Sequence, residues 1–267
     1  MNEDLPFFIK SRLKTRVVGN EVVYHRETDS TNDDAMQFAS RGVDEGWVVI
    51  AGTQRSGKGR RGKTWSAPEG QNVYLSLILR PRISTKRASL LTILAALAVA
   101  ETLEEYIRRD QGQISIKWPN DVMIDDKKIS GILLEMGKDK NGDLFYILGI
   151  GININARRQD MPEEIQNIAT SLYLNLGYAV SLKDIFFKLM YRLDYWYRLY
   201  CSRRFEEIVA RFRSYENTTG KRVSVMAAGH IIEGEAIGID DNGFLHVRDD
   251  TGKVHKTTSG ELRIEDE

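Results

Sequence analysis

The sequence is short of cysteine, of net charge and of long apolar runs, and each shortage excludes a class of protein. Cys201 is the only cysteine among 267 residues, so neither an internal disulfide nor a thiolate metal site can form. The 38 basic and 38 acidic side chains cancel, which argues against coating nucleic acid through bulk charge. No run of 18 apolar residues predicts a membrane span, and the acidic start lacks a secretion signal. We therefore expect a cytoplasmic protein without a membrane partner.

What is present is the composition of a folded globule, with 42% hydrophobic and 28% charged residues. The length suits one large domain with a small one. After Asn217 the pattern changes to short alternating strands separated by Gly or Asn-Gly, which is typical of a small β-barrel or sandwich. The sequence therefore predicts domains at residues 1–217 and 218–267.

The first domain mixes helices with short strands. Ser30 is a candidate helix N-cap and Gly42 the stop of that helix. Hairpin turns at residues 125–126 and 141–142 predict a mixed or antiparallel sheet, because such short loops cannot make parallel crossovers. The expected strands lie at residues 21–25, 47–51, 72–80, 114–118, 122–124, 128–136 and 144–150, and the helices at residues 5–14, 30–42, 86–109 and 181–213. The aromatic side chains of the last helix are expected in the core.

A basic, glycine-rich segment is the strongest sign of chemistry. Residues 55–63 contain five cations and three glycines, and no acid lies between Gly52 and Pro68. An anion would relieve the repulsion, the glycines would let backbone N–H groups approach it, and Trp65 could stack on a purine. The dinucleotide and phosphate-loop patterns do not apply, because the following residues indicate another loop and a strand instead of a helix. A solvated turn, a nucleic-acid patch and a targeting signal are the alternatives.

Two later segments are less specific. Lys128 begins an apolar strand, where a lysine usually reaches to solvent, and Asp121 and Glu135 could be ordinary surface acids. Two glycines in the strand at residues 149–153 indicate a bulge or the close approach of a ligand. Histidines 230, 246 and 255 lack metal-ligand spacing, and residues 139–143 resemble a calcium loop without its bidentate glutamate, so no metal site is expected.

Taken together, five segments resemble one family. They are TDSTN at 28–32, GKGRRG at 57–62 with Trp65, KWPND at 117–121, KISGILLE at 128–135 and GIGIN at 149–153. In this order they are similar to biotin protein ligases, which biotinylate acetyl-CoA carboxylase. The resemblance implies an α+β fold, with a mixed, largely antiparallel sheet packed with helices (a class II synthetase-like core) and a small C-terminal Src homology 3-like β-barrel.

The resemblance also implies a reaction. Biotin and ATP, with Mg²⁺ held mainly through the nucleotide, would give biotinyl-5′-AMP, and a lysine of the biotin carboxyl carrier protein would then accept the biotin. The implied catalytic residues are Lys128, Arg60 and Asp121. The implied biotin-binding residues are Ser30, Thr31, Asn32, Gln54, Lys58, Gly59, Arg60, Lys128 and Gly131. The implied ATP- and adenylate-binding residues are Arg60, Arg61, Trp65, Lys117, Asn120, Lys128 and Asn153.

The sequence departs from the family at two positions. Lys58 stands where arginine is usual, so a bidentate contact with a carboxylate is replaced by a point charge. Arg263 lies closer to the Ser-Gly-Glu segment at 259–261 than the family pattern has it. With about 20 residues before the first strand, the chain resembles the monofunctional form without a DNA-binding domain, and a homodimer is possible. A lipoate ligase of the same fold and a nucleic-acid-binding module are the alternative functions.

Overall fold

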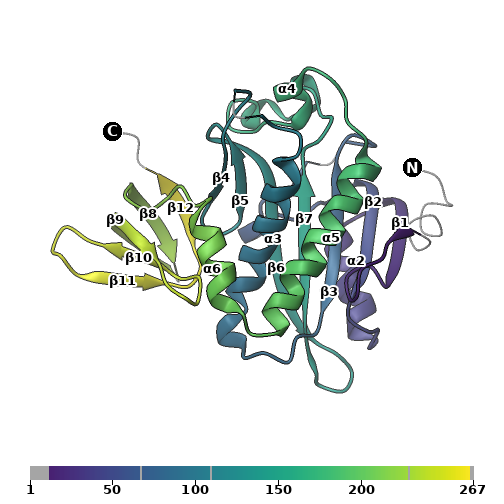
Figure 1. Cartoon of the computed structure of the whole chain (residues 1–267), viewed down its shortest axis with the longest axis horizontal. Helices are drawn as coiled ribbons and strands as arrows, with labels where there is room; N and C mark the ends of the chain where they lie inside the picture. The colour runs from purple at the N-terminus through teal and green to yellow at the C-terminus, as the bar shows by residue number, and fades with distance from the viewer. Residues whose placement is uncertain (1–11, 67, 109, 228, 265–267) are drawn as a thin grey trace.

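The computed structural model describes all residues except 1–11, 67, 109, 228 and 265–267. Two sheets organise the chain, a large one with helices on both faces and a smaller one at its side (Figure 1). The helix expected at residues 5–14 falls almost entirely outside the described part of the chain. The helices are α2 (Thr31–Ser40), α3 (Ser89–Leu103), α4 (Leu172–Leu176), α5 (Leu182–Cys201) and α6 (Phe205–Arg213).

The large sheet has the strand order β1-β2-β3-β7-β6-β5-β4. Its strands are β1 (Glu21–Thr28), β2 (Trp47–Gln54), β3 (Val73–Leu79), β4 (Ile114–Lys117), β5 (Asp121–Ile124), β6 (Lys127–Lys138) and β7 (Leu144–Ile152). β1 and β2 are parallel, joined through α2, and the other neighbours are antiparallel. The expected mixed, largely antiparallel sheet is confirmed.

Both faces of this sheet are covered, which explains the continuous apolar runs of its central strands. Val48 and Ile50 belong to the main core, which also contains the buried sides of α3, α5 and α6. Val49 and Ile78 point the other way and pack with Ala35 of α2. α3 lies between the sheet and the other long helices, so nearly all of its side chains are buried. The α2 face is where the polar residues of the site gather.

The smaller sheet is wholly antiparallel, in the order β11-β10-β9-β8-β12. Its strands are β8 (Arg222–Ala227), β9 (His230–Ile239), β10 (Leu245–Arg248), β11 (Val254–Thr257) and β12 (Glu261–Ile264). Its apolar side chains, Val223 and Leu245 among them, join the main core. The Trp118 indole donates to the Gly243 carbonyl at 2.9 Å, which fixes the end of β4 to this sheet. The predicted α+β class with a small C-terminal β-domain is confirmed.

Two helix predictions were wrong in extent. The helix expected at 86–109 ends at Leu103, and a separate 3₁₀ turn, Thr85–Arg87, precedes it. The helix expected at 181–213 is two helices, because Arg203 takes φ 60° and turns the chain between α5 and α6. Neither glycine nor proline marks this turn, so local sequence gave no sign of it. None of the described helices is long and apolar enough to cross a bilayer.

Candidate functional site

One cavity of about 510 Å³ collects residues from every segment singled out in the sequence. It opens where α2, the glycine-rich loop, β5, β6 and β7 come together, and residues 260–263 of the smaller sheet close one side. All of the residues predicted to bind or catalyse line it, namely Ser30, Thr31, Asn32, Gln54, Lys58, Gly59, Arg60, Arg61, Trp65, Lys117, Asn120, Asp121, Lys128, Gly131 and Asn153. The predicted residues, which lie up to 123 positions apart in the chain, therefore share one site.

The start of α2 forms one polar end of the cavity. Ser30 occupies the N-cap position, as expected, with extended backbone, but its hydroxyl makes no capping hydrogen bond. Gln54, at the end of β2, supplies that contact instead. Its Oε1 accepts from the Thr31 backbone N–H at 2.8 Å and lies 3.1 Å from the Thr31 hydroxyl. A free N–H group of the first helical turn is thus satisfied by a side chain from the neighbouring strand.

Asn32 is held at both ends of its amide. Its Nδ2 donates to Glu135 Oε2 at 2.7 Å, and its Oδ1 lies 2.5 Å from Ser76 Oγ. A Cβ at Gly149 would collide with Asn32 Oδ1, so the strand needs glycine there to admit the amide. Ser76 and Glu135 are functional candidates that the sequence did not identify. The only sign of Ser76 was a lone polar residue in the apolar strand β3.

The glycine-rich loop is a tight hairpin. Trp65 N–H donates to the Gly57 carbonyl at 2.8 Å, and Gly59 N–H to the Lys63 carbonyl at 2.7 Å. Between them one 3₁₀ turn, Arg60–Gly62, contains Arg61 at φ 54°, and Gly62 follows at φ 74°. A Cβ at Gly57 would lie 2.6 Å from the Trp65 carbonyl oxygen. No α-helix opens on the third glycine, which agrees with rejecting the dinucleotide-binding pattern.

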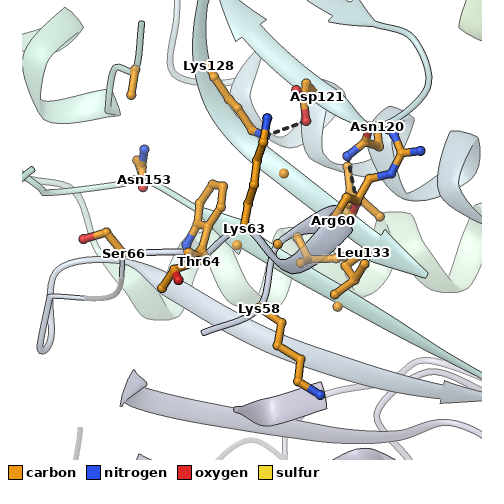
Figure 2. A pocket seen from close by; sticks show the side chains of 18 of the residues that line it. Lys58, Arg60, Lys63, Thr64, Ser66, Asn120, Asp121, Lys128, Leu133 and Asn153 are labelled. Carbon is orange, nitrogen blue, oxygen red and sulfur yellow. Dashed lines mark hydrogen bonds and ion pairs between the residues drawn. The ribbon is translucent and has the colours of Figure 1, made fainter. Parts of the chain in front are cut away.

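The loop cations each have a protein partner in this structure. Arg60 donates to Asn120 Oδ1 at 2.7 Å (Figure 2). Lys58 forms an ion pair with Asp33 of α2. Burial lowers the pKa of Arg60, whereas the hydrogen bond to Asp33 raises the pKa of Lys58. Lys58 extends away from the Arg60–Asn120 pair in Figure 2. The two cations therefore reach different sides of the cavity.

Two further loop cations contact the smaller sheet. Arg61 donates to the Met226 carbonyl, and Lys63 forms an ion pair with Glu261 at 2.5 Å. The hydrogen bond from Lys63 lowers the pKa of Glu261. Arg263, whose role the sequence left open, lines the cavity together with Glu261. The C-terminal domain thus supplies part of the wall and holds two side chains of the loop.

Lys128 and Asp121 form the charged pair of the opposite wall. Lys128 Nζ lies 2.7 Å from Asp121 Oδ1, and the two side chains are 34% and 25% exposed (Figure 2). The β5–β6 hairpin brings them together through Asp125 and Asp126, both at positive φ. Lys117 lies opposite Asp121 in the β4–β5 register, and burial lowers the pKa of Lys117 while the Asp121 charge opposes that shift. Lys128 therefore lines the cavity, and it does not simply extend into bulk solvent as a lysine at the end of a strand usually does.

Trp65 lies against the glycines of the sheet. A Cβ at Gly131 would be 2.8 Å from Trp65 Cζ3, and one at Gly151 would be 2.5 Å from Cε2. Of the two interpretations of the β7 glycines, the bulge is wrong, because the register with β3 and β6 continues through Gly149 and Gly151. The close approach that these glycines allow is made by Asn32 and Trp65. Lys128 Nζ lies 5.5 Å from the Trp65 ring centroid, in cation–π range.

Two amides complete the cavity wall. Asn120 donates to the Ile132 carbonyl at 3.0 Å, which leaves its Oδ1 to accept from Arg60. Asn153 is buried and donates to the Thr170 carbonyl at 3.1 Å. Among the described residues, no three His, Cys, Asp or Glu side chains are grouped so as to hold a metal ion. The cavity wall carries cations, amides and hydroxyls, which are groups that can stabilise an anionic ligand.

Comparison with known proteins gives consistent matches. The family described as "Biotin/lipoate A/B protein ligase family" matches residues 24–155, and the "Biotin protein ligase C terminal domain" matches residues 218–262. The bifunctional ligase/repressor BirA of Bacillus subtilis is 35% identical over 96% of this chain and 78% of its own length. A biotin–[acetyl-CoA-carboxylase] ligase of Mycobacterium tuberculosis is 34% identical over 82% of this chain and 80% of its own.

The fold is shared with a solved structure of the same kind. The biotin protein ligase of Aquifex aeolicus in complex with biotin and ATP has a TM-score of 0.79 and 30% identity, covering 91% of this chain and 99% of the other.

Proposed function

The chain belongs to the biotin protein ligases of the biotin/lipoate A/B protein ligase family, and we propose that it activates biotin with ATP and transfers it to a lysine of the biotin carboxyl carrier protein of acetyl-CoA carboxylase. The observation that carries this proposal is the single cavity lined by all five motif segments. The relatives that are named biotin–[acetyl-CoA-carboxylase] ligases support the choice of substrate and carrier.

In the first step a carboxylate oxygen of biotin attacks the α-phosphorus of ATP, and pyrophosphate leaves with the electron pair of the broken bond. Both reactants are anions, so cations must offset their repulsion as they approach. Lys128 is proposed to bridge the carboxylate and the α-phosphate, and Lys58, Gly59 and Arg60 to hold the same groups. Lys117 adds positive charge from the Asp121 side.

In the second step a carrier lysine attacks the acyl carbon of biotinyl-5′-AMP. An amide bond forms, the acyl–phosphate bond breaks, AMP leaves, and the amine loses its proton to solvent. Asp121 is proposed to orient Lys128 and the incoming amine, since it is within 2.7 Å of Lys128 Nζ. A closed glycine-rich loop would keep water from the anhydride, and Arg60 would retain the adenylate.

The remaining residue roles are also proposals. Ser30, Thr31, Asn32, Gln54 and Gly131 would bind biotin, the first four through polar groups that suit its ureido ring. The nucleotide would be bound by Arg61, Trp65, Asn120 and Asn153, with Trp65 over the adenine. Mg²⁺ would be carried by the triphosphate and would neutralise part of its charge. A cytoplasmic location, a homodimer and the lack of a DNA partner belong to the same proposal.

Incubation with ATP, radiolabelled biotin and a biotin carrier domain tests this function. We expect ATP-dependent labelling of one carrier lysine and release of one AMP per biotin attached. Lipoate in place of biotin is the matched control and should not label the carrier. Labelling by lipoate would assign the chain to the other branch of the family. Tight, salt-dependent binding of RNA without ligation would favour a nucleic-acid module.

A further inference from the structure

Glu135 stands at the end of a hydrogen-bonded chain that leads to the polar end of the cavity. The chain runs from Glu135 through Asn32 and Ser76 to Thr31, and from there to Gln54. Asn32 and Ser76 are buried, so water cannot readily replace their contacts. Glu135 itself is not among the residues that line the cavity. It can act on a ligand through these hydrogen bonds and, by its charge, through Lys58.

The available protons determine which group donates and which accepts at each hydrogen bond between Glu135 and Thr31. An ionised carboxylate only accepts, so Asn32 must turn its NH₂ toward Glu135 and its carbonyl toward Ser76. Ser76 has one proton and is 2.5 Å from Asn32 Oδ1, so that proton goes to Asn32. The Thr31 hydroxyl lies 2.8 Å from Ser76 Oγ and donates its own proton to Gln54 Oε1 at 3.1 Å.

This order of donors and acceptors determines which hydrogen-bonding groups face a ligand in the cavity. With its proton committed, the Thr31 hydroxyl offers only lone pairs to the cavity. Gln54 uses Oε1 on the Thr31 backbone N–H, so its NH₂ is the free end and lies beside Gly57. The wall therefore combines an acceptor with a donor. A ureido group requires this combination, because it has N–H donors on both sides of a carbonyl acceptor.

We propose that Glu135 is a positioning residue that sets the hydrogen-bond polarity of the ureido-binding end of the cavity. This inference rests on the proposed function, since it takes biotin as the ligand. Without the carboxylate, the Asn32 amide can rotate and present NH₂ to Ser76. Ser76 would then donate to Thr31, and the chain would exist in two opposite arrangements. In the reversed arrangement the Ser76 proton occupies one lone pair of the Thr31 hydroxyl, which leaves fewer acceptor sites for the ureido N–H groups, so biotin would have to select the original arrangement.

Biotin binding without ATP measures this effect directly. Glu135→Leu removes the acceptor, and we expect the Kd for biotin to rise about tenfold, the effect of losing one hydrogen bond to a charged group. Glu135→Gln keeps an acceptor, but its amide can also rotate and present NH₂ to Asn32. Its Kd for biotin should therefore lie between those of the unaltered protein and of Glu135→Leu. Desthiobiotin, which has the ureido ring without the thioether, should weaken in parallel. Glu233→Leu, an exposed position on β9, is the matched control and should bind as the unaltered chain does.

Three outcomes would overturn the inference. An unchanged biotin Kd in Glu135→Leu would show that the polarity is set elsewhere. Equal loss in Glu135→Gln and Glu135→Leu would assign the effect to the negative charge, which also acts on Lys58. A fall in melting temperature with parallel losses of biotin and ATP binding would indicate a structural role. If the unaltered chain binds no biotin, the proposed function itself fails, which is a distinct result.

Discussion

Replacing Lys128 with alanine should nearly abolish formation of biotinyl-5′-AMP while leaving the fold intact. Lys128 is the cation that reaches the cavity from the β5–β6 hairpin, and about two thirds of its side chain is shielded from solvent. At an effective dielectric near 20, two unit charges about 4 Å apart interact by roughly 4 kcal/mol. Removing one preorganised donor from a developing oxyanion typically costs about 3–4 kcal/mol. Both estimates predict a rate about 10²- to 10³-fold slower.

The effect on stability should be small by comparison. Asp121 would lose its ion-pair partner, but a quarter of its side chain is exposed and water can solvate it. Partly exposed ion pairs contribute about 0–1 kcal/mol, which corresponds to a melting temperature lower by at most about 4 °C. Loss of activity without loss of fold would therefore separate a role in the reaction from a role in stability.

Single-turnover release of pyrophosphate, with saturating biotin and ATP, is the assay for the Lys128 variant. Lys127→Ala is the matched control, because Lys127 is exposed on the same strand and is not among the cavity residues. Lys128→Arg should recover part of the rate, since it restores charge with a different shape. An unchanged rate in Lys128→Ala, or an equal loss in Lys127→Ala, would refute the assignment.

Three further predictions follow from the geometry. The Arg60→Gly variant should release biotinyl-5′-AMP, and the free adenylate should biotinylate lysines of a non-carrier protein added to the assay. Loss of activity without this labelling would limit Arg60 to the first step. Gly151→Ala places a methyl 2.5 Å from Cε2 of Trp65, the residue proposed to cover the adenine, so ATP affinity should fall about 5- to 150-fold with altered tryptophan fluorescence; unchanged values would mean that Trp65 moves freely. Burial alone would raise the pKa of Asp240, but Lys256 and backbone N–H groups lower it to about 2. The ionised Asp240 therefore stabilises the fold fully above about pH 4, and this stabilisation is lost as the pH falls toward 2. Asp240→Asn should flatten this pH dependence of the melting temperature.

The sequence by itself determined the chemical groups of the site and most of the strands. Cations, glycines and amides are recognisable by residue type, and the strands at residues 47–51 and 72–80 are recognisable as short, largely apolar runs. The mixed or antiparallel sheet followed from the short hairpins at residues 125–126 and 141–142, and the α+β class from the resemblance of the five motif segments to a family. These features depend on neighbours within a few residues, and that information is local.

The tertiary structure alone decided which single polar residues matter. Ser76 and Glu135 are ordinary in their strands, and they become part of the site because β3 and β6 turn those positions toward α2. The contacts of Arg61 with Met226 and of Lys63 with Glu261 join positions more than 160 residues apart. The turn at Arg203 contains no glycine or proline from which it could be predicted. Each of these depends on pairing between distant segments, and no periodicity or spacing in the sequence encodes which partner a side chain will meet.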